Sequence, residues 1–80
     1  MRIELLTSPD CPHAASTRQL LLDALAAAGI DVPVIERVGA YPSPTVLIDG
    51  VDVMRPGEIL EGDSCRLDSP TRQRLLSALT

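Results

Sequence analysis

The strongest constraint on the fold is a change of hydrophobic period along the first 38 residues. Residues 2–7 alternate charged and apolar side chains and then turn wholly apolar, which predicts a buried strand that ends at a Ser-Pro turn signal. Residues 12–28 carry apolar side chains at helical spacing, and Gly29 supplies a left-handed residue at the end of that helix. Residues 31–38 are rich in β-branched side chains and predict a second strand. Strand, helix and strand in this order predict a right-handed parallel βαβ unit.

An Asp-Gly pair divides two apolar runs in the second half of the chain. Residues 45–48 and 51–54 flank Asp49-Gly50, which is the strongest short-range signal for a two-residue hairpin turn. Two antiparallel strands are therefore expected here. Residues 39–44, which precede them, are interrupted by glycine and proline and are expected to form a connection without regular structure.

The C-terminal segment predicts one more helix. Residues 55–68 are broken by proline and glycine, so at most one helical turn is expected there, around residues 58–61. Ser69 is expected to cap a last helix with Pro70 in its first position. The apolar side of this helix is formed by Leu75, Leu76 and Leu79.

Together these elements predict a single α/β domain over residues 1–80, with helices packed on a four-stranded mixed sheet. The first strand is expected in a central position, because a lone parallel pair beside a detached hairpin would leave two apolar faces uncovered in so small a chain. If the third strand pairs antiparallel with the first, the connection before the hairpin crosses over the end of the first strand. Tyr41, Pro42 and Ser43 are then expected close to Cys11.

Composition limits the functions that this chain can carry. The net charge is −4 and the seven basic residues, all arginine, are scattered, which argues against a nucleic-acid partner. The sequence has no apolar run of the length of a signal peptide or membrane helix and no lipidation motif, so a cytoplasmic protein without a membrane partner is expected. Cys11 and Cys65 could form a structural disulfide, but in a reducing cytosol thiols with chemical, metal-binding or packing roles are expected.

Cys11, Pro12 and His13 form the strongest candidate site. A cysteine at the start of the first helix meets unpaired backbone N–H groups and the positive end of the helix dipole, which favour the thiolate and lower its pKa below the usual value of about 8.5. Pro12 suits the first helical position, and His13 can donate a hydrogen bond to the sulfur or add a positive charge beside it. The alternative is that Cys11 only caps the helix and that His13 is a solvated residue.

The order of elements over essentially the whole chain resembles the thioredoxin-like superfamily in its small, glutaredoxin-sized form. Cys11-Pro12-His13 is similar to the first three residues of the Cys-Pro-His-Cys motif of periplasmic disulfide oxidases, and Ser43-Pro44-Thr45 resembles the cis-proline signature of the superfamily. The resemblance implies that Pro44 is cis and faces Cys11, and that the backbone at Ser43 pairs with an extended thiol substrate. The substrate-contact surface that it implies consists of Tyr41, Ser43, Pro44 and Thr45.

The sequence departs from this family in two ways that concern chemistry. Ala14 occupies the position of the second, resolving cysteine, so Cys65 or an external thiol is the candidate resolving group for Cys11. No Gly-Gly-Asp pattern of the kind that holds glutathione in glutaredoxins follows the hairpin, which argues against glutathione dependence. The expected function is thiol-disulfide redox chemistry with a thiol- or disulfide-containing protein or small molecule, and no cofactor is required.

A second function class follows from the segment around Cys65. Cys65-Arg66-Leu67-Asp68 resembles the Cys-x-x-Asp spacing of organomercurial lyases, in which paired cysteines capture mercury and an aspartate delivers a proton. This resemblance implies binding of Hg(II) or another soft metal by Cys11 and Cys65, with Asp68 as the proton donor. The alternative for Asp68 is an acidic residue that the dipole of the last helix favours near its N-terminus. The alternative for Cys65 is a small buried residue that packs beneath a loop. A non-catalytic interaction module with the same fold is a third alternative, and the oligomeric state stays open.

Overall fold

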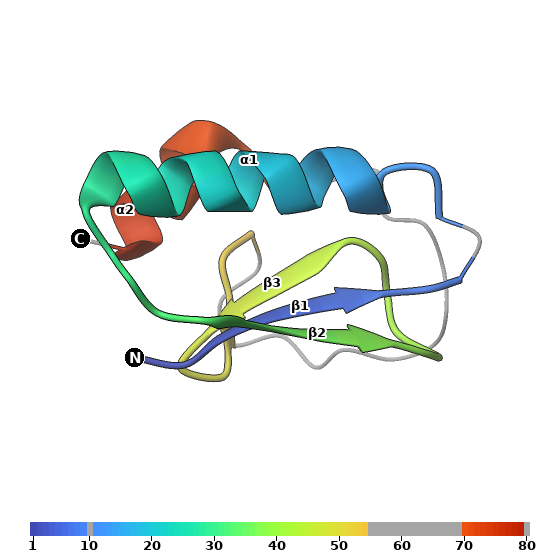
Figure 1. Ribbon diagram of the computed structural model, residues 1–80. Helices are drawn as coiled ribbons and strands as arrows, with labels where there is room; N and C mark the ends of the chain where they lie inside the picture. Colours follow the sequence, from blue (N-terminus) through green and yellow to red (C-terminus); the bar gives the residue numbers. More distant parts are fainter. Residues whose placement is uncertain (10, 55–69, 80) are drawn as a thin grey trace.

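The structure is a computed structural model that describes residues 1–9, 11–54 and 70–79 (Figure 1). These described residues form one mixed β-sheet and two helices, and the α/β class expected from the sequence is confirmed. The elements along the chain are β1 (Ile3–Thr7), α1 (Ala14–Ala28), β2 (Val34–Val38), β3 (Thr45–Ile48), β4 (Val51–Asp52) and α2 (Arg72–Leu79).

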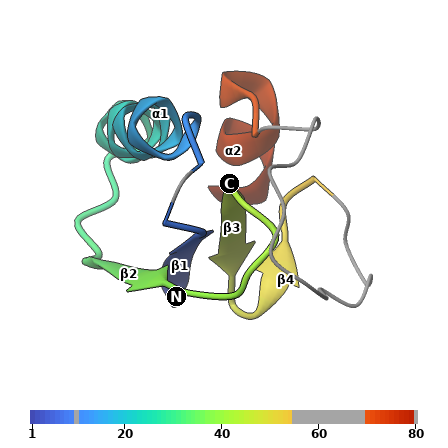
Figure 2. The same cartoon turned by 90° about the vertical axis from the view of Figure 1, so that its right-hand side faces the viewer.

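β1 lies inside the sheet and β2 at one edge, in the order β2-β1-β3-β4 (Figure 2). β1 runs parallel to β2, with Ile3 beside Val34, and antiparallel to β3, with Leu6 beside Thr45. The parallel pair needs a crossover, which α1 supplies, whereas a two-residue turn is enough to join β3 and β4. The predicted internal position of the first strand and its antiparallel pairing with the third strand are therefore confirmed.

Residues with positive φ stand where the sequence predicts a turn and a helix end. Asp49 and Gly50 form the turn between β3 and β4 with φ of 53° and 82°, the sign that a type I′ turn requires at both positions. Gly29 follows α1 with φ of 69°, and its N–H donates to the carbonyl of Ala26. Both glycines adopt a backbone conformation that a side chain would penalise.

The two helices lie on the same face of the sheet and contact each other (Figure 1). α1 buries one stripe of side chains that includes Leu21 and Leu25, and α2 buries Leu75 and Leu79 one turn apart. These leucines pack against the inward-facing side chains Ile3, Leu5, Val46 and Ile48 of the sheet. The core is aliphatic, as a chain without Phe or Trp requires.

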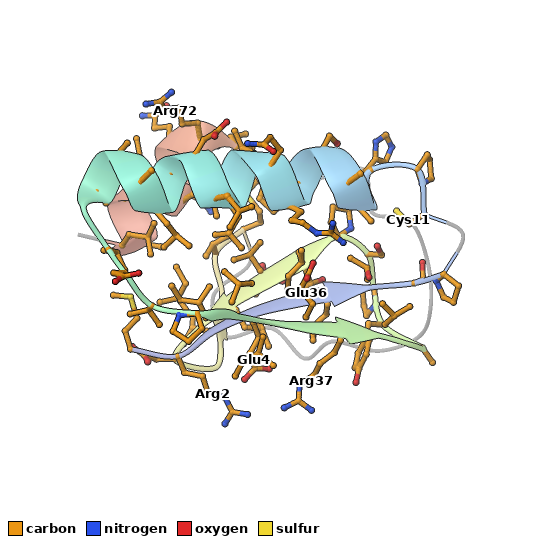
Figure 3. All side chains as sticks on the ribbon, in the orientation of Figure 1. Arg2, Glu4, Cys11, Glu36, Arg37 and Arg72 are labelled. Atoms are coloured by element: carbon orange, nitrogen blue, oxygen red, sulfur yellow. The ribbon has the colours of Figure 1, made fainter. Side chains whose placement is uncertain are left out.

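The opposite face of the sheet carries a group of charged side chains (Figure 3). The Nε of Arg2 donates to one carboxylate oxygen of Glu4 at 2.6 Å, and the Nε of Arg37 lies 3.6 Å from the other. The Glu4 side chain is only 12% exposed, so two guanidinium groups flank a largely buried carboxylate. Because Arg2 and Glu4 alternate with Ile3 and Leu5 along the chain, these two charged side chains lie on the face of the sheet away from the helices.

Four boundaries before α2 differ from the sequence predictions. β1 begins at Ile3 rather than at residue 2, α1 at Ala14 rather than at residue 12, and β2 at Val34 rather than at residue 31. β4 ends at Asp52, two residues earlier than the apolar run. Hydrophobic periodicity identifies the face that an element buries, whereas its ends depend on individual backbone hydrogen bonds.

The start of the last helix also differs. α2 begins at Arg72, and the hydroxyl oxygen of Thr71 accepts the N–H of Arg74 at 3.2 Å, as an N-cap does. The predicted cap, Ser69, and the helical turn expected at residues 58–61 lie outside the described residues. Thr71 supplies a side-chain hydroxyl oxygen as acceptor, as a serine cap would, and it lies closer in the sequence to the buried leucines of the helix.

Neither of the described helices is long and apolar enough to cross a membrane. α1 has 15 residues and α2 has 8, whereas a spanning helix needs about 20 apolar residues.

Candidate functional site

Cys11 lies in the connection between β1 and α1, at one end of the molecule (Figure 3). Its N–H donates to the carbonyl of Ser8 at 3.3 Å, and its carbonyl accepts the N–H of Ala14 at 3.4 Å. The second bond closes a four-residue turn with Pro12 and His13 at its centre. His13 has φ −90° and ψ −4°, the values of the third residue of a type I turn, and Pro12 occupies the second position, where proline is favoured. The turn therefore holds the sulfur at a defined place ahead of the helix.

This turn corrects the predicted role of Pro12 as the first helical residue. α1 begins at Ala14, and His13 is its N-cap without a side-chain capping bond. The carbonyl of Cys11 accepts the N–H of Ala14, so the first amide of the helix is used by the turn and not by the sulfur. Cys11 therefore lies farther from the helix end than the sequence pattern placed it, and the dipole effect falls off over such a distance.

The second part of the site is the connection between β2 and β3. Its Ser43–Pro44 peptide bond is cis, in agreement with the resemblance. The Thr45 hydroxyl donates to the carbonyl of Pro42 at 2.5 Å, and Thr45 pairs with Leu6 in the sheet. This pairing fixes the start of β3 beside the end of β1, from which the cysteine-bearing turn follows. Ser43, Pro44 and Thr45 are all buried.

The sulfur of Cys11 lies against the backbone of Ser43. Its Sγ is 3.6 Å from the Ser43 carbonyl oxygen, although 32 positions separate the two residues. Cys11 takes part in a disulfide bond, which corrects the expectation of a free thiol, and it is only 8% exposed. A disulfide sulfur carries no hydrogen, so this approach is a packing contact in the disulfide-bonded state. In a reduced protein of the same geometry, the thiol S–H can donate to this carbonyl oxygen.

Ser43 also carries a buried side-chain hydroxyl. The residue is 0% exposed, and its Oγ has no hydrogen-bond partner among the described residues. A buried polar group without a partner costs about 1–3 kcal/mol of stability. Sequence reasoning found Ser43 only through its backbone, because the burial of this hydroxyl depends on long-range packing that no local pattern reports.

His13 and Tyr41 lie near the site but form no described hydrogen bond with the sulfur. His13 is exposed, and its carbonyl accepts both the hydroxyl of Ser16 and the N–H of Thr17 at 3.0 Å. Tyr41 is half-buried, and its N–H donates to the carbonyl of Gly39 at 2.9 Å. A Cβ on Gly39 would lie 3.3 Å from the Tyr41 ring, so the absence of a side chain there makes room for the ring.

The remaining predicted site residues, Cys65 and Asp68, lie outside the described residues. Across residues 1–9, 11–54 and 70–79, no group of three or more histidine, cysteine, aspartate or glutamate side chains is arranged to hold a metal ion. A site with two thiolates would need Cys65 in addition to Cys11.

Comparison of the chain with protein-family models, with curated proteins and with solved structures finds no match.

Proposed function

We propose that this protein is a thioredoxin-like thiol-disulfide redox protein in which Cys11 is the exchanging sulfur and Cys65 its intramolecular partner. The observation that carries the proposal is the contact between the disulfide-bonded sulfur of Cys11 and the carbonyl of Ser43, directly before cis Pro44. Cys65 is the only other cysteine of the chain, so an intramolecular bond has no alternative partner.

The arrangement of elements supports the thioredoxin-like part of the proposal. A parallel βαβ unit is followed by a β-hairpin and a closing helix, with the sheet order β2-β1-β3-β4 and both helices on one face. The cysteine follows the internal strand β1, and the cis proline precedes its antiparallel neighbour β3. Fold likeness alone does not assign an activity, so the chemistry rests on the sulfur and its surroundings.

The proposed reaction is a two-step exchange that conserves atoms and electrons. A thiolate of an external dithiol attacks one sulfur of the Cys11–Cys65 bond, which forms a mixed disulfide and releases the other sulfur as a thiolate. The second thiol of the reductant then displaces the protein sulfur, so that the reductant leaves as a disulfide. The protein gains two electrons and, on protonation, two S–H groups. The reverse sequence oxidises a partner dithiol.

Burial of the cis-proline connection affects which partners can react. Ser43, Pro44 and Thr45 are buried in the disulfide-bonded state, and Cys11 is 8% exposed. An extended peptide that pairs with the Ser43 backbone therefore needs this connection to become accessible first. A small dithiol needs access only to a sulfur, so we expect small dithiols to reduce the protein faster than protein dithiols do.

The proposal is tested by equilibrating the protein with dithiothreitol mixtures of known potential, alkylating the free thiols and mapping them by mass. We expect Cys11 and Cys65 to become alkylated together, as a single two-electron couple. A Cys65→Ser variant treated with a small disulfide should accumulate a mixed disulfide on Cys11, whereas Cys11→Ser should lose exchange activity. Independent alkylation of the two cysteines at every potential would contradict the proposal.

Soft-metal binding remains a second candidate, because the disulfide at Cys11 favours it. Because Cys11 is joined to a second sulfur in the oxidised protein, reduction yields two thiols that the same fold can bring together. Such a pair suits the near-linear coordination of Hg(II). Titration of the reduced protein with Hg(II) distinguishes the candidates: a 1:1 complex that either single Cys→Ser variant loses would favour metal binding, with Asp68→Asn testing the proposed proton donor. If both cysteines show neither exchange nor metal binding, the interaction module is favoured.

A further inference from the structure

β2 forms an open edge of the sheet (Figure 2). Among the described strands it pairs only with β1. The N–H of Gly39, one residue beyond β2, donates to the carbonyl of Thr7 in β1 at 2.9 Å. Because successive residues of a strand direct their backbone groups to opposite sides, the N–H and C=O groups of Val34, Glu36 and Val38 face the open edge. Such a row of backbone groups is a template for another strand.

Exposed apolar side chains gather along this edge. Val38 is 67% exposed and Ile35 is 40% exposed, while Leu22 on the adjoining part of α1 is 44% exposed. They are three of the five large hydrophobic residues that are exposed in the described part of the chain. The sequence predicts β2 as a strand rich in β-branched residues. In the structure its position at the edge leaves the side chains of Ile35 and Val38 exposed, as part of an apolar surface.

A cleft of about 260 Å³ lies between α1 and β2, on the helix side of this edge. Its apolar wall consists of Leu21, Leu22, Val32, Pro33 and Val34. Arg18 and Glu36 border it and form an ion pair, with 2.5 Å between the Nε and the carboxylate oxygen. The cleft thus offers an apolar recess directly beside Val34, where a side chain from a neighbouring strand would project.

We propose that β2 pairs antiparallel with β2 of a second copy of this chain, around a twofold axis at Glu36. In this register Val34 lies opposite the partner's Val38, and each is a residue whose backbone groups face the open edge. Residues directly opposite in an antiparallel pair share a face of the sheet. The exposed Val38 of each copy therefore enters the cleft beside Val34 of the other, and the two sheets continue into one.

The apolar side chains favour this register over its neighbours. Moving the axis to Ile35 or Arg37 would place Glu36 opposite Val34 or Val38, so that Val34 and Val38 no longer face each other across the two strands. With the axis at Glu36, the two carboxylates meet while each remains paired with Arg18 of its own α1. Like charges directly opposite destabilise a strand pair. The ion pair of each Glu36 with Arg18 leaves the group of four charges neutral overall and reduces this repulsion.

The other face of the interface is compatible with the same register. Ile35 lies opposite the partner's Arg37, whose apolar stem can cover it while the guanidinium reaches toward Glu4 of its own β1, 3.6 Å away. A contact between two five-residue strands is at the low end of interface sizes, so the dimer is expected to dissociate on dilution.

Disulfide cross-linking of introduced cysteines tests the register. With the native disulfide left intact, Glu36→Cys should form a reducible covalent dimer at least tenfold faster than Val51→Cys. Val51 is an exposed control in β4, at the opposite edge of the sheet. Opposed Cα atoms in a hydrogen-bonded antiparallel pair are about 5.5 Å apart, within disulfide range. Val34→Cys and Val38→Cys should each cross-link slowly alone, because like positions are roughly 13 Å apart along the strand, and rapidly when mixed.

Sedimentation equilibrium over a concentration series tests the association itself. The average mass of the native chain should rise from 8.5 kDa toward twice this value, and Val38→Lys should lose the rise while Val51→Lys retains it. Circular dichroism verifies that both variants are folded. A mass of one chain up to millimolar concentration, or equal cross-linking rates for Glu36→Cys and Val51→Cys, would overturn the proposal. Rapid cross-linking of Val34→Cys alone would overturn the register.

Discussion

The sulfur of Cys11 and the carbonyl oxygen of Ser43 lie 3.6 Å apart at the end of the sheet where β1 finishes and β3 begins. The contact follows from the pairing of Leu6 with Thr45, because Cys11 follows β1 through a short turn and Ser43 precedes β3 by one proline. A disulfide-bonded cysteine therefore packs on the one connection of the described chain that contains a cis peptide bond. Reduction or substitution of this cysteine is therefore expected to change the packing of that connection.

Reduction of the protein is expected to lower its stability. A bond between positions 11 and 65 would close a loop whose entropy in the unfolded chain corresponds to about 4 kcal/mol. Urea unfolding with and without a phosphine reductant measures the difference. The double variant Cys11→Ser/Cys65→Ser should unfold as the reduced protein does and should not respond to reductant. An unchanged midpoint of the native protein, with both thiols shown to be alkylated, would count against the proposed pairing.

Ser43→Ala is expected to stabilise the disulfide-bonded protein, by about 1 kcal/mol or more, because it removes a buried hydroxyl that lacks a partner among the described residues. Ser16→Ala is the matched control, since the exposed Ser16 hydroxyl donates to the carbonyl of His13 at 3.0 Å. That control should change stability by no more than about 0.5 kcal/mol. Urea midpoints of the three proteins give the comparison, and destabilisation by Ser43→Ala would show that its hydroxyl is satisfied.

Leu21→Ala should destabilise the protein by about 2–5 kcal/mol, because Leu21 is 0% exposed and packs between α1 and the sheet. Leu22→Ala removes the same atoms from the next position of the helix, which is 44% exposed, and should cost much less. Thermal unfolding of dilute samples checks both variants. Equal losses would mean that the helix is rotated relative to the sheet.

Gly50→Ala is expected to cost about 1–2 kcal/mol. Gly50 has φ of +82°, and a Cβ there would meet no atom within 4 Å, so the penalty is conformational and not steric. Gly50→Asn should lose less stability, since asparagine tolerates a left-handed backbone better than alanine does. Unfolding free energies from denaturant titration rank the three chains, and a loss for asparagine as large as that for alanine would contradict this explanation.

Part of the candidate site was predictable from short patterns. Cys11-Pro12-His13 directs attention to the β1–α1 connection, and Ser43-Pro44-Thr45 to the connection before β3. Their meeting followed from topology, since an antiparallel third strand beside the first brings these two connections to one end of the sheet. The hydroxyl of Ser43, the turn that takes Pro12 out of the helix and the packing of Tyr41 over Gly39 were not predictable, because each depends on a contact made after the strands assemble.

The sequence by itself determined the kind and order of the elements. Local backbone preferences are encoded by adjacent residues, so Asp49-Gly50 specifies the hairpin turn and Gly29 the end of α1 without reference to the rest of the chain. The apolar periodicity of residues 12–28 likewise indicates a helix with one buried stripe, and in the structure this stripe contains Leu21 and Leu25.

Only the tertiary structure decided where elements begin and which side chains remain outside. The carbonyl of Cys11 captures the N–H of Ala14, and α1 therefore starts later than its apolar pattern. The β-branched residues of β2 resemble a core strand, but β2 lies at the edge, where Val38 stays exposed. Burial is a property of the partners that surround a residue, and those partners come from distant parts of the chain through the register of β1 with its two neighbours.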